Sequence, residues 1–399
     1  MTATTIPQIR LTRQLDSGSV TATTTWSSDA NGPAGGPEKR VRAKVDNGDD
    51  SEMELEAHGV AVRRVGFRSG RDAELAAMHL VESEIEAERR PGARPQPLES
   101  YIAFARRLPS QFDDHTWLAE TSEGTPVGCS ACWSNSVGDP TVMECYVYVR
   151  RPWRRRGVAW HLTRPIIDTA EAEGRSSLVG STFDSVLAGR AFALRIGARA
   201  ARVNRTSEMR MSDVDWDLVQ SWIDTGRARP LGYSLDYWDG PFPKELAGDA
   251  AAFHHIVQTK PRDDLRVADV VLDADHVAEL DRALVEAGRQ RWTIFVRDVG
   301  DRCVGGTEVT FEPWDATAAL QQNTAIGGPH RGLGLAKWVK ASMLDRIRRE
   351  RPEVESVRTS NAFSNSAMLA INNRLGFKII EVRTEWQGLT VNLRRALRT

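Results

Sequence analysis

The sequence of 399 residues has no run of 18 consecutive apolar residues and contains only four cysteines. A membrane-spanning helix needs about 20 predominantly apolar residues, so none is predicted. Four cysteines in a chain of this length are too few for a disulfide-stapled scaffold. Residues 1–10 show no apolar run behind a basic start, so we expect no signal peptide. These absences predict a cytoplasmic protein with reduced thiols and no membrane attachment.

Neither sign of charge is in excess. Lys plus Arg is 53 and Asp plus Glu is 54, which gives a net charge of -1. A near-neutral chain gives no general reason to expect a nucleic-acid partner or a polybasic membrane surface. Only seven of the cations are lysines. We interpret this bias towards arginine as the mark of a GC-rich bacterial genome.

Cys129 and Cys132 form a Cys-x-x-Cys spacing without a second pair elsewhere. The surrounding segment alternates like a β-strand, in which residues three apart point to opposite faces. The two thiols are therefore poorly placed to share a zinc ion, and we predict no metal site.

Length suggests two domains, because single cores seldom exceed about 250–300 residues. Residues 1–57 are rich in Thr, Ser, Asp and Gly without lasting periodicity, and we predict a disordered tail there. We place the domain boundary near residue 230, which gives domains at 58–230 and 231–399. Ser212 and Asp213 are predicted to cap a short helix that bridges them.

The two predicted domains share one order of elements, namely strand, helices, hairpin, strand, helix, strand. In the first, helical spacing spans 72–90 and a long strand covers 141–149. In the second, helices are expected at 244–259, 276–287 and 333–349. This repetition predicts an internal duplication.

Both repeats contain the pattern Arg-x-x-Gly-x-Ala, at 154–159 and at 331–336, between a predicted strand and a predicted helix. The first N–H groups of a helix lack intrahelical partners and carry partial positive charge. Glycine lets the backbone approach a ligand closely, and arginine adds charge. Each turn is therefore a candidate diphosphate site. The alternative is a pair of ordinary arginine-rich turns.

The segments VYVRRPWRRRGVAWHL and TAIGGPHRGLGLAKWVK resemble the coenzyme A motif of the GCN5-related N-acetyltransferases (GNAT family). TSNAFSNSAMLAINNRLGFKII, in the second repeat, resembles the motif that follows it in that family. Two such domains in one chain resemble the tandem acetyltransferases of actinobacteria. The resemblance implies an α/β (α+β) fold, with two domains that each have a mixed, mainly antiparallel sheet flanked by helices.

The resemblance also implies a set of coenzyme-binding positions. The strand ends Val149 and Ile326 would offer backbone groups to the pantetheine arm, and Asn361 and Asn365 match the second motif. The pyrophosphate would be held by Arg154, Arg155, Arg156, Gly157, Val158 and Ala159 in the first domain, and by Arg331, Gly332, Leu333, Gly334, Leu335 and Ala336 in the second.

The second domain matches the family motifs more closely, so we predict that it is the catalytic one. The first has TFDSVLAGRAFALRIGA in place of the second motif, and Pro165 falls inside its predicted coenzyme helix, where it should produce a kink. The tyrosine that often serves the departing sulfur in this family is replaced by Asn372 in the second domain and by Ala193 in the first.

A base must take the proton of an attacking amine. Glu308 and Glu144 lie on predicted strands that border the expected cleft. A strand carboxylate among apolar neighbours can have a raised pKa suited to that role. The alternative is that either glutamate simply faces solvent.

These features predict N-acetylation of a small-molecule amine with acetyl-CoA as co-substrate and without a metal. The acetyl group would pass directly between the two substrates in a ternary complex. A non-catalytic acyl-CoA-binding module and an aminoacyl-tRNA-dependent acyltransferase are the alternatives. The sequence leaves the acceptor open, and also whether the chain forms a homo-oligomer.

Overall fold

The computed structural model describes residues 53–55, 59–228, 232–270 and 272–397. The predicted tail lies outside these ranges apart from Met53–Leu55, which form strand β1 and pair antiparallel with β2 (Val60–Val65). The predicted boundary at residue 230 also lies outside the described residues. The described residues all belong to one compact unit.

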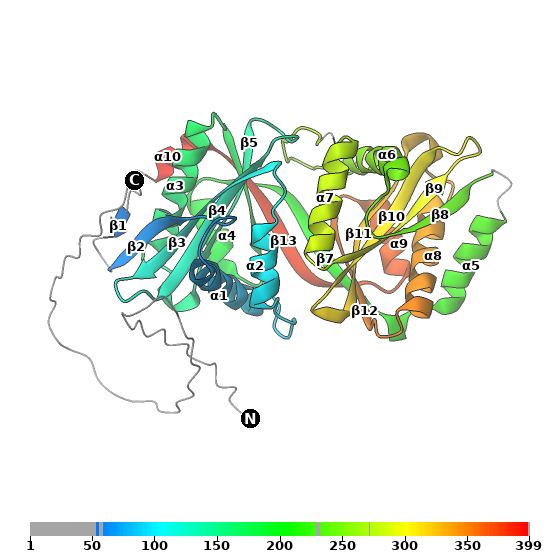
Figure 1. Ribbon diagram of the computed structural model, residues 1–399, viewed down its shortest axis with the longest axis horizontal. Coiled ribbons are helices and arrows are strands. Elements are labelled where there is room, and N and C mark those ends of the chain that lie inside the picture. The colour runs from blue at the N-terminus through cyan, green and yellow to red at the C-terminus, as the bar shows by residue number, and fades with distance from the viewer. Residues whose placement is uncertain (1–52, 56–58, 229–231, 271, 398–399) are drawn as a thin grey trace, which may run out of the picture. The chain divides into compact units, whose positions relative to one another are not determined.

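The chain passes twice through one series of elements (Figure 1). The first pass continues from β2 through α1 (Asp72–Arg89), α2 (Leu98–Arg106), β3 (Phe112–Thr121), β4 (Pro126–Asn135), β5 (Val142–Val149), α3 (Val158–Ala172), β6 (Ser177–Phe183), α4 (Leu187–Arg195), β7 (Arg199–Arg210) and α5 (Trp216–Arg227). The second comprises β8 (Ser234–Asp239), α6 (Ala247–Gln258), α7 (Ala274–Glu286), β9 (Gln290–Arg297), β10 (Cys303–Glu312), β11 (Asp315–Ile326), α8 (Leu335–Glu350), β12 (Ser356–Ala362), α9 (Ser366–Arg374), β13 (Lys378–Leu389) and α10 (Thr390–Ala396). The mixed, mainly antiparallel fold predicted from the sequence is confirmed.

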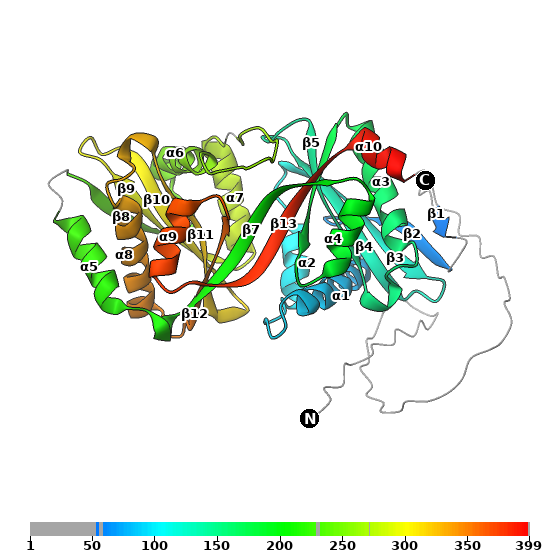
Figure 2. The ribbon, with the colours of Figure 1, turned by 180° about the vertical axis from the view of Figure 1, so that it is seen from behind.

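The described strands form one sheet in the order β1-β2-β3-β4-β5-β6-β13-β7-β12-β11-β10-β9-β8. The two halves exchange their last strands. β13, from the second half, pairs with β6 of the first, and β7, from the first half, pairs with β12 of the second. The exchanged strands also pair with each other, and both views of the ribbon show them crossing between the halves (Figures 1 and 2).

The helices that follow the exchanged strands are exchanged as well. α5 packs on α8, and its Trp222 and Ile223 belong to the core of the second half. α10 packs on α3, where Leu393 joins the core of the first half and the indole N–H of Trp160 donates to the carbonyl of Leu397 at 3.2 Å. Each core is therefore completed by residues that lie beyond the other half in the sequence.

Alternating residues of the strands give each half an apolar cluster on both faces of its sheet. On β9, Ile294 belongs to the cluster under α8, and its neighbour Phe295 to the cluster under α6. On β3, Trp117 lies in the cluster under α3 and Leu118 in the cluster under α1. Helices thus cover both faces of the sheet in each half. The ends of the strands are not covered in this way, and the candidate site lies there.

Two local predictions can be compared with the structure. The cap predicted at Ser212 and Asp213 is wrong, because these residues lie in a 3-10 turn and α5 is capped by Asp215, whose carboxylate accepts from the N–H of Leu218. The helix predicted around Pro165 continues through the proline as α3.

The strand exchange predicts that the halves do not fold as separate chains. A fragment ending at residue 230 lacks β13 and α10, which leaves the edge of β6 unpaired and the core around Leu393 open. We expect each isolated fragment, cut at 230, to lose its cooperative thermal transition, and the co-expressed fragments to purify as one complex that regains it. Independent cooperative melting of the fragment 58–230 would contradict this.

Candidate active site

In each half, one pair of parallel strands separates part-way along its length. β11 and β12 stay in register from Ala318↔Ser356 to Gln321↔Thr359 and then diverge. β5 and β6 pair over a shorter stretch, which ends at Glu144↔Val179. Beyond each point the backbone on the facing edges has no strand partner, so a ligand with amide groups can pair there.

A β-bulge lies next to the separation in the second half. Thr307 pairs with Thr324 and Val309 with Gln321, so Glu308 of β10 stands opposite two residues of β11. Bulges often redirect side chains at binding sites. This one brings Glu308 beside Asn323, whose side-chain N–H donates to the Glu308 carboxylate at 2.9 Å.

The two predicted phosphate turns have closely similar backbones. Each follows a short 3-10 turn, and each helix begins after a left-handed glycine, Gly157 (φ 85°) or Gly334 (φ 76°). A second left-handed residue is Gly332 (φ 77°) in one turn and Arg155 (φ 63°) in the other. A side chain in that conformation costs roughly 1–2 kcal/mol, so the second turn adopts its shape with less strain.

Both turns present free main-chain donors. Among the described residues, no acceptor is bonded to the N–H groups of 155–159 or 332–336. Five consecutive free amides ahead of a helix make a suitable anion site. The structure therefore gives both halves the backbone geometry expected from the sequence.

The arginine that opens each motif folds back onto the preceding strand. Arg154 donates from Nε to the carbonyl of Val149 at 3.0 Å, and Arg331 to that of Ile326 at 2.9 Å. These carbonyls, predicted to face pantetheine, thus already accept one hydrogen bond each. The arginines brace the turn in addition to any role in binding phosphate.

The outer ends of these two arginines have different partners. Arg154 makes two bonds to the carboxylate of Glu88, and this contact lowers the Glu88 pKa. Arg331 instead donates to the hydroxyl of Thr259 at 2.6 Å. Because this hydroxyl is neutral, it does not balance the positive charge of Arg331. The first turn retains exposed cations in Arg155 and Arg156.

A cavity of about 190 Å³ opens where β11 and β12 separate. Its lining comes from both halves, because the exchanged strands border it. The lining residues are Gln322 and Thr324 of β11, residues 359–362 of β12, Asn365 and Met368 of α9, Lys340 of α8, Arg202 and Asn204 of β7, Arg383 of β13, and Lys260 with Pro261 after α6.

Asn361 and Asn365, both predicted from the sequence, lie on this lining. Asn365 caps α9 by accepting from the N–H of Met368 at 3.3 Å. Asn361 accepts from the side chain of Asn372 at 2.8 Å. Asn372, at the position for which the resemblance implied a tyrosine, is 3% exposed and holds Asn361 in place.

Lys340 is a cavity residue that sequence reasoning missed. It is 1% exposed, its ammonium lies 5.5 Å from the centre of the Phe377 ring, and it has no carboxylate partner among the described residues. Burial lowers the pKa of Lys340 to about 7. The equivalent position of α3 is Thr163, which bonds its own helix at Ala159, so the first half lacks this group.

Glu308 reaches the cavity through a bridge. The carboxylate is 4% exposed and is not on the lining. Asn323 connects it to Lys260, which donates to the Asn323 side-chain oxygen at 2.7 Å. Burial lowers the pKa of Lys260, an effect opposed by Glu308 and reinforced by Arg202.

Glu144, the other predicted base, is linked electrostatically to the same region. Desolvation and the negative charge of Glu385 raise the Glu144 pKa, while Arg383 and Arg202 oppose the shift. These arginines line the cavity of the second half. The strand exchange therefore places both predicted bases around one group of charged residues.

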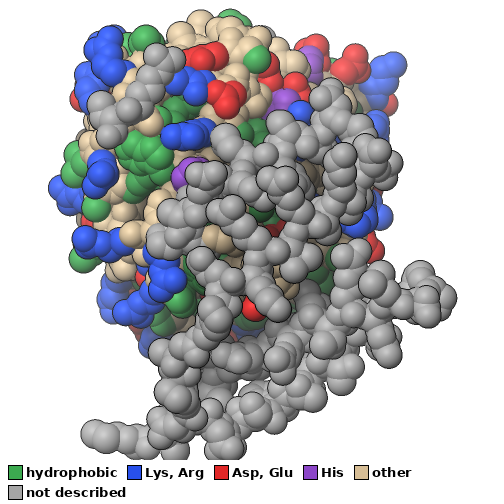
Figure 3. All heavy atoms as spheres, turned by 90° about the vertical axis from the view of Figure 1, so that its left-hand side faces the viewer, with side chains coloured by type: hydrophobic (Ala, Val, Ile, Leu, Met, Phe, Trp, Pro, Cys, Tyr) green, Lys and Arg blue, Asp and Glu red, His purple; other side chains and the backbone are tan. Residues whose placement is uncertain are grey.

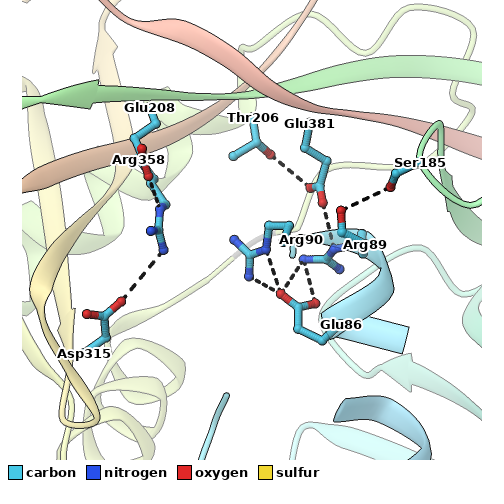
Figure 4. A network of polar contacts seen from close by, with 9 residues as sticks. All are labelled: Glu86, Arg89, Arg90, Ser185, Thr206, Glu208, Asp315, Arg358 and Glu381. Atoms are coloured by element: carbon cyan, nitrogen blue, oxygen red, sulfur yellow. Dashed lines mark hydrogen bonds and ion pairs between the residues drawn. The ribbon is translucent and has the colours of Figure 1, made fainter. Parts of the chain in front are cut away.

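A side-chain bridge spans the corresponding region of the first half. Arg89, at the end of α1, forms an ion pair of 2.7 Å with Glu381 of β13 and lies 4.1 Å from the centre of the Phe183 ring. Ser185 donates to the Arg89 carbonyl at 3.2 Å. Figure 4 shows Arg89 between Glu381 and Glu86, beneath the crossing strands. This bridge ties α1 to β13 in the half where the second-motif asparagines are missing.

Residues 80–198, which contain the separated strands β5 and β6 and the first turn, match the model of the acetyltransferase (GNAT) family. The chain carries a GNAT acetyltransferase domain. No curated protein matches the chain in sequence.

Solved structures extend the GNAT fold across both halves. A tandem GNAT protein from the clavulanic acid biosynthesis pathway, solved without acetyl-CoA, is 22% identical with a TM-score of 0.68, covering 82% of this chain and 98% of its own. A GCN5-related N-acetyltransferase from Sphaerobacter thermophilus is 12% identical with a TM-score of 0.59, covering 82% and 96%. The described residues thus have the tandem GNAT fold, and the family that residues 80–198 match is one of acetyltransferases.

The buried ammonium of Lys340 predicts a pH-dependent cost to stability. The Lys340 pKa falls from 10.5 to about 7 on folding, so the unfolded state binds the extra proton between these values. Stability should rise with pH across that window. We expect Lys340→Met to raise the free energy of unfolding by on the order of 3 kcal/mol near pH 6, with the gain shrinking towards pH 10.

Urea unfolding at about pH 6, 8 and 10 measures this effect. Lys337→Met, on the same helix but only partly buried, serves as the control and should change stability little at any pH. Destabilisation by Lys340→Met at pH 6, or a gain that is the same at every pH, would contradict the assignment.

Proposed function

We propose that this protein is an acetyl-CoA-dependent N-acetyltransferase that acts on the primary amine of a small molecule, with its working site in the second half. The observation that supports this most is the combination of five free amides at 332–336 with a cavity at the separation of β11 and β12. The first half has the same turn. Its second-motif asparagines are absent, and Arg89 bridges to Glu381.

Charged groups would hold the charged end of the coenzyme, and uncharged polar groups would hold its uncharged arm. The amides of 332–336 and the charge of Arg331 would bind the pyrophosphate. The free edge of β11, from Gln322 to Ile326, would pair with the amides of the uncharged pantetheine arm. Asn361 and Asn365 would meet that arm from β12 and α9, and the acetyl group would enter the cavity.

The transfer forms a carbon–nitrogen bond and breaks the carbon–sulfur bond of the thioester. Holding both substrates in one cavity supplies part of the rate, because the reaction then needs no further loss of translational freedom. The departing sulfur needs little help, since a thiol with a pKa near 8.5 leaves tolerably as thiolate. This is compatible with Asn372 standing where relatives have a tyrosine.

The amine must lose a proton during the reaction. Glu308 and Glu144 remain our proposed bases, and neither carboxylate is on the cavity lining. Proton transfer to either one therefore requires an intervening water. Lys260 and Lys340 lie on the lining itself, and both have lowered pKa values.

The sequence also left open a module that binds acyl-CoA without turnover. The absence of a carboxylate from the described lining favours that alternative, and the four lining cations, which suit an anionic acceptor, count against it. An enzyme that uses aminoacyl-tRNA would be expected to have a positively charged surface that binds the RNA phosphates. On the part of the face visible in Figure 3, side chains of both signs occur together.

Calorimetric titration with acetyl-CoA tests the proposed site. We expect one binding event per chain, and we expect Arg331→Glu to weaken it by about tenfold to a hundredfold, because a charge-assisted contact is replaced by repulsion. Arg154→Glu is the matched control in the first half and should leave the affinity unchanged. Two equal sites, or a loss caused by Arg154→Glu alone, would contradict the assignment to the second half.

Turnover separates the enzyme from the binding module. Release of coenzyme A thiol in the presence of a panel of small amines is the expected result. Tight binding without release for any amine would favour the module.

A further inference from the structure

Every charged residue on the lining of the second-half cavity is a cation. These residues are Arg202, Lys260, Lys340 and Arg383, and no carboxylate of the described part of the chain is on the lining. A cleft lined by one sign of charge attracts ligands of the opposite sign. The proposed coenzyme does not account for this charge, because its pantetheine arm is neutral, its pyrophosphate belongs at 332–336, and its 3′-phosphate lies beyond the pyrophosphate, on the side away from the acetyl group.

The carboxylates near these cations stand behind the lining and are shared. Glu385 pairs with both Arg202, at 2.7 Å, and Arg383, at 2.9 Å. Glu144 acts on the same two arginines from β5. Glu308 acts on Lys260 through Asn323. Lys340 has no carboxylate partner among the described residues.

The lining also holds a hydrogen-bond donor without an acceptor. The side-chain N–H₂ of Asn204 is buried and unpartnered, and the residue is 5% exposed. A buried donor left unpaired costs about 1–3 kcal/mol, so a ligand that supplies an oxygen acceptor there gains affinity. Asn204 lies directly opposite Arg383 in the β7–β13 pairing, which places both residues at one wall.

We infer that the acceptor is a small amine that carries a carboxylate, of the amino-acid type, and that Arg383, Arg202 and Asn204 hold its carboxylate. Planar guanidinium groups match the two oxygens of a carboxylate. The cavity of about 190 Å³ favours a small acceptor. This inference rests on the proposed acetyltransferase function and names its substrate class.

The same charges would help the chemistry. An ammonium ion bound beside Lys260, and below about pH 7 also beside protonated Lys340, is disfavoured by like charge, which lowers the pKa of the bound amine and favours its free form. The lone pair needed for attack on the thioester is then available without a carboxylate on the lining. An amine without a carboxylate would only be repelled by these cations, whereas the carboxylate of an amino acid is attracted to them.

The first half lacks this arrangement. Gly197 and Gly376 stand at equivalent points after α4 and α9, so Glu381 occupies the position equivalent to Arg202. Glu381 is an anion that is already paired with Arg89. The carboxylate subsite is therefore specific to the second half, although β7 of the first half supplies part of it.

Matched pairs of acceptors test the inference with the full-length protein. Glycine is compared with methylamine, L-lysine with cadaverine, and L-tyrosine with tyramine, by thiol release from acetyl-CoA. The methyl ester of each amino acid removes the charge but keeps the shape. We expect kcat/KM for the acids to exceed that for their partners and esters by at least tenfold. Arg383→Gln should reduce this preference about tenfold, and Arg383→Lys, which keeps the positive charge but not the planar fork, should reduce it by less.

Acetyl-CoA affinity is measured on the same variants and should not change. Equal turnover of acids and decarboxylated amines would overturn the carboxylate subsite and leave the acetyltransferase intact. An equal loss of kcat/KM for amino acids and for decarboxylated amines in Arg383→Gln would also overturn the carboxylate subsite. Failure of the wild-type protein to bind acetyl-CoA would overturn the proposed function itself, and this inference with it.

Discussion

The pairing of β13 with β7 is the interaction on which the rest of the structure depends. Each strand leaves its own half and completes the sheet of the other, and the helix that follows it completes the other core. The ladder also carries side chains into the candidate site, since Arg202 and Asn204 come from β7 and Arg383 from β13. Stability and the proposed chemistry therefore share one set of backbone hydrogen bonds.

The two halves have the same arrangement of strands and helices but differ in the side chains at the site. Both have separated parallel strands, a turn with free amides and a helix behind it. In the first half, the Arg154 charge is paired with Glu88 and Arg89 bridges to Glu381. In the second, the equivalent space is a cavity that contains an unpaired lysine. This difference supports our proposal that the working site lies in the second half.

Local sequence patterns predicted the repeated elements and the backbone of both turns, because glycine placement and helix starts depend on neighbouring residues. The exchange could not be predicted in this way, because strand pairing is non-local and the sequence carries no mark of which edge a strand joins. Arg202 and Arg383 were missed for that reason. Lys340 was detectable, since lysine is scarce here and this one interrupts an apolar helix face. The helix cap was predicted at Ser212 and Asp213, whereas Asp215 caps α5. The prediction failed because several residues in this segment have side chains that can cap a helix.

The central claim is that acetyl-CoA binds at the second turn, and amide hydrogen exchange tests it most directly. The free N–H groups of 332–336 and 155–159 should both exchange rapidly in the unliganded protein. On addition of acetyl-CoA, the account predicts slowed exchange at 332–336 and along β11, with 155–159 unchanged. Unchanged exchange at 332–336, or protection confined to 155–159, would contradict it.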